Sequence, residues 1–336
     1  MTRIRECDTI QLLFEQEGRS LLKLSVVVPC YNEGDNIVDF YRESEAALHD
    51  IIGDTEFIFV NDGSSDDTGR RLSELCAKEG TSITAVEFSR NFGKEAAILA
   101  GLERSRGEYT AIIDADLQQR PEYVRQMTEF LDQHPEYDCV AAYQAQRKEG
   151  RGQAFFKDRF YKIFNRTTEV ELRASASDFR VMRRNMVQAV LSLKEKIRFS
   201  KGIFSWVGYN TYYMPYKVEE RHAGSSKWNF FKLTRYALDG IMSFSDMPLK
   251  AALYLGVCLG LVSLTMLIAI IVQAALPGVF VSKLLIGLFF AFLLSGINLA
   301  ALGIVGVYLA RVYREVKGRP VYIIKSVQES SRNKKE

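Results

Sequence analysis

The sequence has few of the residues from which several common kinds of site are built. It contains three histidines and five cysteines in 336 residues, and no two cysteines have the Cys-x-x-Cys spacing of a structural zinc site. An odd number of scattered cysteines favours a reducing compartment over a disulfide framework. Zinc chemistry and disulfide chemistry are therefore poor interpretations of this chain.

A large excess of charge of one sign is also absent. The 44 Lys and Arg residues nearly balance the 41 Asp and Glu residues, and the formal net charge is +3. Proteins that bind nucleic acids usually carry a strong basic excess, so we expect no nucleic-acid partner. Any binding of phosphate must depend on local groups of basic side chains.

Two glycine-rich phosphate-binding patterns are missing. No Gly-x-Gly-x-x-Gly follows the first apolar run, and Gly-x-x-x-x-Gly-Lys-Ser/Thr occurs nowhere in the chain. These absences exclude the usual dinucleotide and P-loop sites. Residues 1–21 contain no apolar stretch of the roughly 7–15 residues that a signal peptide needs, so we interpret them as an N-terminal extension of unknown role.

Between residues 22 and 226, short apolar runs alternate with stretches that have helical patterns. Five of the runs are rich in β-branched residues, as buried parallel strands are, and they cover residues 24–28, 57–60, 83–88, 109–113 and 139–143. The helical patterns cover residues 36–52, 67–78, 95–104 and 121–133. The alternation predicts a doubly wound, Rossmann-like α/β domain, in which ligands bind at the carboxyl ends of the strands.

Acidic residues follow three of these predicted strands. After the fourth strand, Asp114 and Asp116 are separated by one residue, and Gln118 adds an amide oxygen. An all-oxygen set of this kind suits Mg²⁺ or Mn²⁺. For one of the two acids the alternative is capping of the helix that begins near Pro121.

The strand-end motifs resemble those of a known enzyme family. The motifs are Pro-Cys-Tyr-Asn-Glu at residues 29–33, Asn-Asp-Gly-Ser-Ser at 61–65, Ser-Arg-Asn-Phe-Gly-Lys-Glu at 89–95 and Asp-Ala-Asp-Leu-Gln at 114–118. In this order they resemble the inverting, GT-A glycosyltransferases of family 2. The chain is most similar to the polyprenyl-phosphate glycosyltransferases that carry a C-terminal membrane hairpin, such as the bactoprenol glucosyltransferases and dolichyl-phosphate mannose synthases. The resemblance extends from residue 24 to about residue 325.

The resemblance implies roles for individual residues. It implies nucleotide-sugar binding by Pro29, Tyr31, Glu33, Val60, Asp62, Lys94, Asp114 and Ala115. It implies metal binding by Asp114, Asp116 and Gln118, with a catalytic role for Asp116 as well. A turn-forming aspartate is the alternative for Asp62, and a solvated lysine is the alternative for Lys94.

Asp178 matches the position of the catalytic base in the family. A phosphate monoester has a second pKa near 6, so it is largely deprotonated at pH 7 and needs little help from a base. Asp178 is therefore expected either to act as the base or to orient the acceptor or the sugar, and a structural strand-end aspartate is a further alternative. The resemblance also implies that phosphates are bound by Arg198, Lys201, Arg221 and Lys227. For Lys227, a charge that merely flanks the membrane is an equal alternative.

Two long uncharged runs follow the α/β domain, at residues 251–276 and 284–310. Each has roughly 26 residues, and a membrane-spanning helix needs roughly 20. We expect a transmembrane hairpin at 249–312, preceded by an interfacial amphipathic segment at 227–248 and followed by a basic tail at 313–336. Two buried helices of a large soluble domain are the alternative.

Basic residues crowd the outer ends of the two runs, so we expect both termini and the catalytic domain on the cytoplasmic side of the plasma (inner) membrane. Gly256 and Gly260 form a Gly-x-x-x-Gly pair. Such a pair favours close helix packing, either within the hairpin or in a homo-oligomer.

These observations together predict the inverting transfer of a hexose to undecaprenyl or another polyprenyl phosphate, giving a lipid-linked sugar for cell-envelope glycosylation. UDP-glucose is the expected donor, by resemblance to the bactoprenol glucosyltransferases. The alternatives are another UDP-sugar or GDP-sugar donor, a processive polysaccharide synthase and a non-catalytic membrane scaffold. The chain lacks the Gln-x-x-Arg-Trp motif of the synthases, and it keeps the metal-binding acids that a scaffold would not need.

Overall fold

The computed structural model describes residues 22–78, 82–144, 176–196, 198–217, 265, 268 and 283–330. The chain divides into two compact units. The first unit contains the described residues up to 217 and also those from Pro320 onward. The second unit contains the helix α11 (Lys283–Val316).

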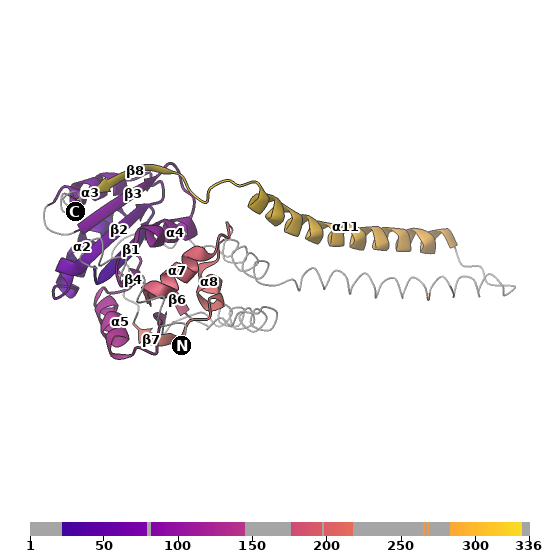
Figure 1. Ribbon diagram of the computed structural model, residues 1–336. Helices are drawn as coiled ribbons and strands as arrows, with labels where there is room; N and C mark the ends of the chain where they lie inside the picture. The colour runs from indigo at the N-terminus through magenta and orange to yellow at the C-terminus, as the bar shows by residue number, and fades with distance from the viewer. Residues whose placement is uncertain are drawn as a thin grey trace. The chain divides into compact units, whose positions relative to one another are not determined.

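A mixed sheet of eight strands lies at the centre of the first unit, in the order β7-β5-β6-β4-β1-β2-β3-β8 (Figure 1). The strands are β1 (Leu24–Cys30), β2 (Thr55–Asn61), β3 (Ser82–Phe88), β4 (Tyr109–Ile112), β5 (Cys139–Gln144), β6 (Ala176–Arg183), β7 (Thr211–Tyr216) and β8 (Ile324–Glu329). β1 pairs in parallel with β2 and β4, and β2 pairs in parallel with β3. β6 is antiparallel to both β4 and β5, so all five strands predicted from the sequence point in one direction.

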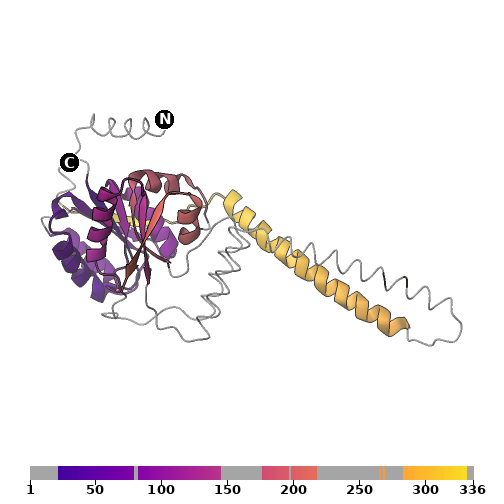
Figure 2. The same cartoon turned by 90° about the horizontal axis from the view of Figure 1, so that it is seen from below.

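Helices cover both faces of this sheet (Figures 1 and 2). They are α2 (Gly34–Ala47), α3 (Thr68–Cys76), α4 (Lys94–Arg104), α5 (Glu122–Gln133), α7 (Arg184–Ser192) and α8 (Ser200–Trp206). α2 packs against α3 and α5, and α4 packs against α7. The first predicted helix ends earlier than expected, at Ala47, and a short 3₁₀ helix (Ile52–Asp54) leads into β2.

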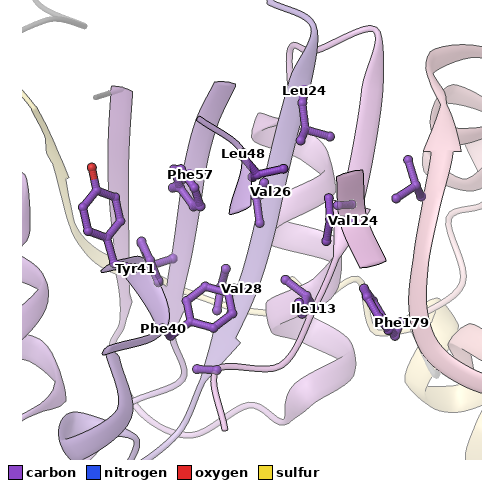
Figure 3. Close-up of a cluster of buried hydrophobic side chains, with 14 of the residues drawn as sticks. Leu24, Val26, Val28, Phe40, Tyr41, Leu48, Phe57, Ile113, Val124 and Phe179 are labelled. Atoms are coloured by element: carbon purple, nitrogen blue, oxygen red, sulfur yellow. The ribbon is translucent and has the colours of Figure 1, made fainter. Parts of the chain in front are cut away.

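The core explains why the strand ends are held in place. Figure 3 shows Val26 of β1 beside Phe57 of β2 and Phe40 of α2 next to Val28 of β1, and all four are almost fully buried. These side chains recur at every second strand residue, which is the period of one face of a sheet. On the opposite face α4 approaches β1 so closely at Gly101 that a Cβ there would overlap the side chain of Val27.

The C-terminal segment differs from the expectation. Residues 313–336 were predicted to be a basic tail, but Ile324–Glu329 forms β8, which pairs antiparallel with β3 at the edge of the sheet. β8 is mostly exposed, and its backbone pairs along the edge strand β3. The α/β domain therefore includes residues that follow α11 in the chain.

The predicted transmembrane hairpin is not confirmed. The second expected span lies inside α11, which is 34 residues long. Among the residues that the structure describes, no helix meets the combined requirement of length and apolar character for crossing a membrane. The first expected span, apart from residues 265 and 268, and the amphipathic segment 227–248 lie outside the described residues.

Candidate active site

The first two strand-end motifs are neighbours in space. Val60 is opposite Pro29 and Asn61 is opposite Cys30 in the parallel register of β1 and β2. Beyond the last pair, the backbone N–H of Asp62 donates to the carbonyl oxygen of Cys30 at 2.9 Å. The sheet therefore brings the predicted nucleotide-binding residues of both motifs to one edge.

Asp62 holds a loop next to these strand ends. Its carboxylate accepts hydrogen bonds from the backbone N–H groups of Phe92 at 2.6 Å and Gly93 at 2.9 Å. Burial raises the pKa of Asp62, and these hydrogen bonds and the charge of Arg90 oppose that effect. Gly63 has a φ of +62°, and a Cβ there would overlap the backbone of Arg90. Asp62 thus joins the turn after β2 to the loop 89–93, and a contact with the nucleotide stays a prediction.

Polar side chains that the sequence analysis missed join the β1 and β2 motifs. Asn32 has a positive φ of 55°, its N–H donates to Ser64 Oγ at 2.9 Å, and its Oδ1 accepts from the N–H of Ser65 at 2.9 Å. Tyr31 remains 39% exposed, and Glu33 accepts from the side chain of Asn36. Hydrogen bonds of Asn32 thus hold the turns after β1 and β2 together, and the Tyr31 ring stays accessible beside them.

The segment after β4 separates oxygen-bearing side chains from buried ones. Asp114, Asp116 and Gln118 are partly exposed, whereas Ala115 and Leu117 between them are each 2% exposed. Leu117 has a positive φ of 58°, and Gln118 N–H donates to Asp116 Oδ1 at 3.2 Å. The predicted metal-binding side chains therefore share the accessible side of this turn. Two carboxylates and an amide fit a hard divalent cation that takes its other ligands from phosphate and water.

Lys94 connects two of the predicted acidic residues. Its Nζ lies 2.7 Å from Asp114 Oδ1 and 3.4 Å from Asp178 Oδ2. Burial alone would lower the pKa of Lys94, but the two carboxylates outweigh burial and raise it. Lys94 is therefore a charged bridge between the ends of β4 and β6, and the alternative of a merely solvated lysine is wrong.

Asp178 lies on β6 with one carboxylate oxygen unsatisfied. Its Oδ1 is buried and has no hydrogen-bond partner among the described residues. Burial would raise the pKa of Asp178, but the positive charges of Lys94, Lys201 and Arg180 outweigh burial and lower it. Asp178 is thus an ionised carboxylate with one buried oxygen that no described residue hydrogen-bonds.

Gln119, which the sequence analysis did not single out, fixes the geometry between Asp114 and β6. Its Oε1 accepts from the backbone N–H of Asp114 at 3.2 Å, and its Nε2 donates to Ser177 Oγ at 3.3 Å. Gln119 is 6% exposed. The sequence alone does not distinguish Gln119 from Gln118, because only the structure shows that Gln119 is buried and Gln118 partly exposed.

Glu95 is a second residue that the sequence analysis gave no role. Its Oε2 accepts from the N–H of Ser200 at 2.9 Å and also from Ser200 Oγ. Burial raises the pKa of Glu95 to about 7, and Asp178 adds to the effect, while Ser200 and Lys94 oppose it. The pair joins the start of α4 to the start of α8, where Lys201 follows Ser200.

The structure gives Arg198 a different role from the predicted one. Its guanidinium donates to the carbonyl oxygens of Leu193 at 2.9 Å and Val190 at 3.3 Å, at the C-terminal end of α7. A cation is favourable at this end of a helix because the last carbonyl groups carry partial negative charge. We therefore leave Arg198 out of the phosphate site. Arg221 and Lys227 lie outside the described residues.

Comparisons with known proteins show the family of this chain. Residues 25–191 match the family model "Glycosyl transferase family 2". The chain is 38% identical to a putative glycosyltransferase, CsbB, of Bacillus subtilis, over 90% of this chain and 91% of the relative. It is 36% identical to the bactoprenol glucosyl transferase of Shigella phage SfII, over 90% and 98%. The chain belongs to glycosyl transferase family 2, and it is a glycosyltransferase with a GT-A, Rossmann-like mixed sheet.

Another relative is an uncharacterized glycosyltransferase, sll0501, of Synechocystis, which is 40% identical over 90% of this chain and 95% of the relative. Among solved structures, the chain is similar to the mannosyltransferase PcManGT of Pyrobaculum calidifontis in complex with GDP-Man and Mn²⁺. That match has 16% identity and a TM-score of 0.48, and it covers 84% of this chain and 86% of the other.

Proposed function

We propose that this glycosyltransferase moves a hexose from a nucleotide sugar to polyprenyl phosphate, with inversion at the anomeric carbon. UDP-glucose is the proposed donor and undecaprenyl phosphate the proposed acceptor, and the lipid-linked product would serve cell-envelope glycosylation. The observation that carries the proposal is the line of charges Asp114–Lys94–Asp178 across the ends of β4 and β6. Relatives named bactoprenol glucosyl transferase, 35–36% identical over almost their full length, support the choice of acceptor.

The donor diphosphate is proposed to bind at the turn after β4. Asp114, Asp116 and Gln118 would hold Mg²⁺ or Mn²⁺ there, because all three present oxygen atoms on the accessible side. When bound, the cation supplies neutralisation of the charge that develops on the departing diphosphate. The nucleoside is proposed to lie over the cross-linked turns of β1 and β2, against Tyr31.

The transfer itself needs little proton chemistry from the protein. An oxygen of the acceptor phosphate attacks the anomeric carbon while the bond from that carbon to the donor diphosphate breaks, and the bonding electron pair leaves with the diphosphate. The attacking phosphate is already largely ionised at pH 7. Asp178 is therefore proposed to orient a hydroxyl group through its unsatisfied Oδ1, and Lys94 and Lys201 to offset the negative charge of the two substrates.

The membrane assignment belongs to the same proposal. The uncharged runs within residues 249–312 are proposed to form a hairpin, with both termini and the active site on the cytoplasmic side and with Arg221 and Lys227 binding phosphate near the bilayer surface. An impermeant thiol reagent applied to the outside of intact cells should label a cysteine placed at Gly278. Protection at this position, with labelling of a cysteine placed at Lys325, whose side chain is 62% exposed, would reverse the orientation.

A panel of nucleotide sugars tests the transfer reaction. Membranes containing the full chain are incubated with Mg²⁺ or Mn²⁺, polyprenyl phosphate and labelled UDP-glucose, UDP-galactose or GDP-mannose, and the label in extracted lipid is counted. UDP-glucose should label lipid fastest, and membranes without the chain should give background. Faster labelling from GDP-mannose would correct the donor, and transfer to free sugars in preference to lipid would overturn the acceptor.

A further inference from the structure

The strand β8 and the residue before it are tied to the catalytic domain at several points. Besides the pairing of β8 with β3, Ser89 N–H donates to the carbonyl oxygen of Ile323 at 3.0 Å, and Ser330 N–H donates to the carbonyl oxygen of Ile83 at 2.9 Å. Lys325 Nζ lies 2.7 Å from Glu87 Oε1. The contacts thus begin at Ile83 and continue past the end of β3 into the loop that follows it.

Tyr322 lies where this loop begins. Its ring stacks on Phe88, the last residue of β3, with centroids 4.8 Å apart and planes at 15°. Its hydroxyl group donates to the carboxylate of Glu103 in α4. Tyr322 therefore touches both the strand that enters the loop Ser89–Gly93 and the helix that leaves it.

The same loop meets the donor side of the site. Phe88 contacts Phe92 edge-on with centroids 5.7 Å apart, and Arg90 lies over the Phe92 ring at 4.1 Å. The N–H groups of Phe92 and Gly93 are the donors to Asp62. An unbroken series of contacts thus leads from Tyr322 through Phe88 and Phe92 to the Asp62 turn.

We propose that the segment just before β8 is part of the donor site, with Tyr322 as a positioning residue that holds the loop Ser89–Gly93 against Asp62. Because the contacting segment follows α11 in the chain, the residues on both sides of the proposed hairpin would together shape one nucleotide site. The inference rests on the proposed function, since that function places the nucleotide on the β1 and β2 turns. It adds a residue and a segment that none of the strand-end motifs contains.

Hydrogen exchange measures the loop directly and needs no substrate. In the full chain in detergent, Tyr322→Ala should speed amide exchange at Phe92 and Gly93 by about tenfold, because the stacked pair with Phe88 is lost. Exchange in β1 should not change. Tyr322→Leu keeps an apolar side chain without the ring and should have the same effect, so a folding defect of the alanine variant cannot hide the result.

Binding and kinetics then separate donor positioning from general damage. The Kd of UDP, measured with Mn²⁺ present, and the KM for the donor should rise about threefold to tenfold in Tyr322→Ala, while kcat and the KM for polyprenyl phosphate stay unchanged. Tyr322→Phe keeps the stacked ring, loses the bond to Glu103 and should restore near wild-type values. Lys325→Ala is the matched control, because it breaks a contact of β8 with β3 without touching Phe88.

The outcomes for the two proposals are distinct. If wild type binds neither UDP nor GDP and labels no lipid, the proposed function fails, and the exchange data alone then decide whether Tyr322 holds the loop. If wild type transfers sugar but Tyr322→Ala and Tyr322→Leu show unchanged loop exchange and an unchanged donor KM, the positioning role of Tyr322 is wrong. Equal effects of Lys325→Ala and Tyr322→Ala would also overturn it.

Discussion

The two halves of the site are built differently. In the donor half, which comprises the turns after β1 and β2 and the loop 89–93, polar groups are bound to one another, as Asp62 is to Phe92 and Gly93. In the transfer half, which comprises Lys94, Asp114, Asp116, Gln118 and Asp178, charged groups meet mainly through Lys94. Here one buried oxygen, Asp178 Oδ1, has no partner among the described residues.

The difference agrees with the task that the proposed function gives to each half. A protein surface that already has its bound shape binds a nucleoside more tightly, because less free energy is spent on ordering its loops and side chains. Groups that act on charge developing during transfer must keep some hydrogen-bonding capacity for the substrates, at some cost in stability. Substitutions in the donor half should therefore change affinity and loop order, and those in the transfer half should change turnover.

The largest effect is expected in the transfer half from Asp116→Asn. The substitution keeps the size of the side chain and removes a negative charge from the proposed cation site, which should lower kcat by about 10³-fold or more. The unfolding temperature should stay close to that of wild type. Lipid labelling with Mg²⁺ and with Mn²⁺ measures the effect, and near-normal turnover with either ion would remove Asp116 from the metal site.

Asp178→Asn should have the next largest effect, a fall in kcat of about 10²-fold with an unchanged donor KM. If Asp178 orients a hydroxyl group, the rate should still fall at low pH in the variant, because that fall reflects protonation of the acceptor phosphate near pH 6. A pH profile of kcat for both proteins tests this. A low-pH limb that vanishes in Asp178→Asn would make Asp178 the base.

In the donor half, Asp62→Asn should have a smaller effect, on donor affinity and on stability. An asparagine keeps one oxygen for Phe92 N–H but turns an amide NH₂ group toward Gly93 N–H, so one hydrogen bond is lost. The cost should be about 1–2 kcal/mol of stability and about a tenfold rise in donor KM, with little change in kcat. Steady-state kinetics and thermal unfolding measure both effects. A fall in kcat with an unchanged KM would erase the proposed distinction between the halves.

Much of the fold and part of the site could be predicted because local patterns encode them. The five predicted strands all occur and share one direction, since buried parallel strands are continuous β-branched runs. Asp114, Asp116 and Gln118 are all partly exposed, and their binding of a metal stays a prediction. Lys94 reaches Asp114 because the loop before α4 returns to the edge of the sheet where β4 ends.

What could not be predicted depends on partners far away in the chain. β8 pairs with a strand more than 200 residues earlier, and the β-branched run at residues 321–327 does not indicate that partner. The resemblance implied that Arg198 binds phosphate, but only the structure shows the carbonyl groups at the end of α7 to which it donates. Gln119 and Glu95 were missed for the same reason, as their partners lie on β6 and α8.

The smallest effect on turnover is expected from Glu95→Gln, at the border between the halves. Burial raises the pKa of Glu95 to about 7, above its usual value of 4.5, so the folded state favours the neutral form. Stability associated with Glu95 is thus fully present below about pH 4.5 and is lost as the pH rises toward 7. Glutamine is neutral at every pH and keeps an oxygen for Ser200, so the variant should gain on the order of 1–3 kcal/mol relative to wild type between pH 5 and pH 8. Thermal unfolding of both proteins across this range measures the gain, with Glu103→Gln as a control.

The activity of Glu95→Gln at pH 6 should stay within about threefold of wild type, because Glu95 touches α8 and not the proposed reacting atoms. A stability difference that does not change with pH, or one that favours wild type at high pH, would show that Glu95 is ionised in the folded protein.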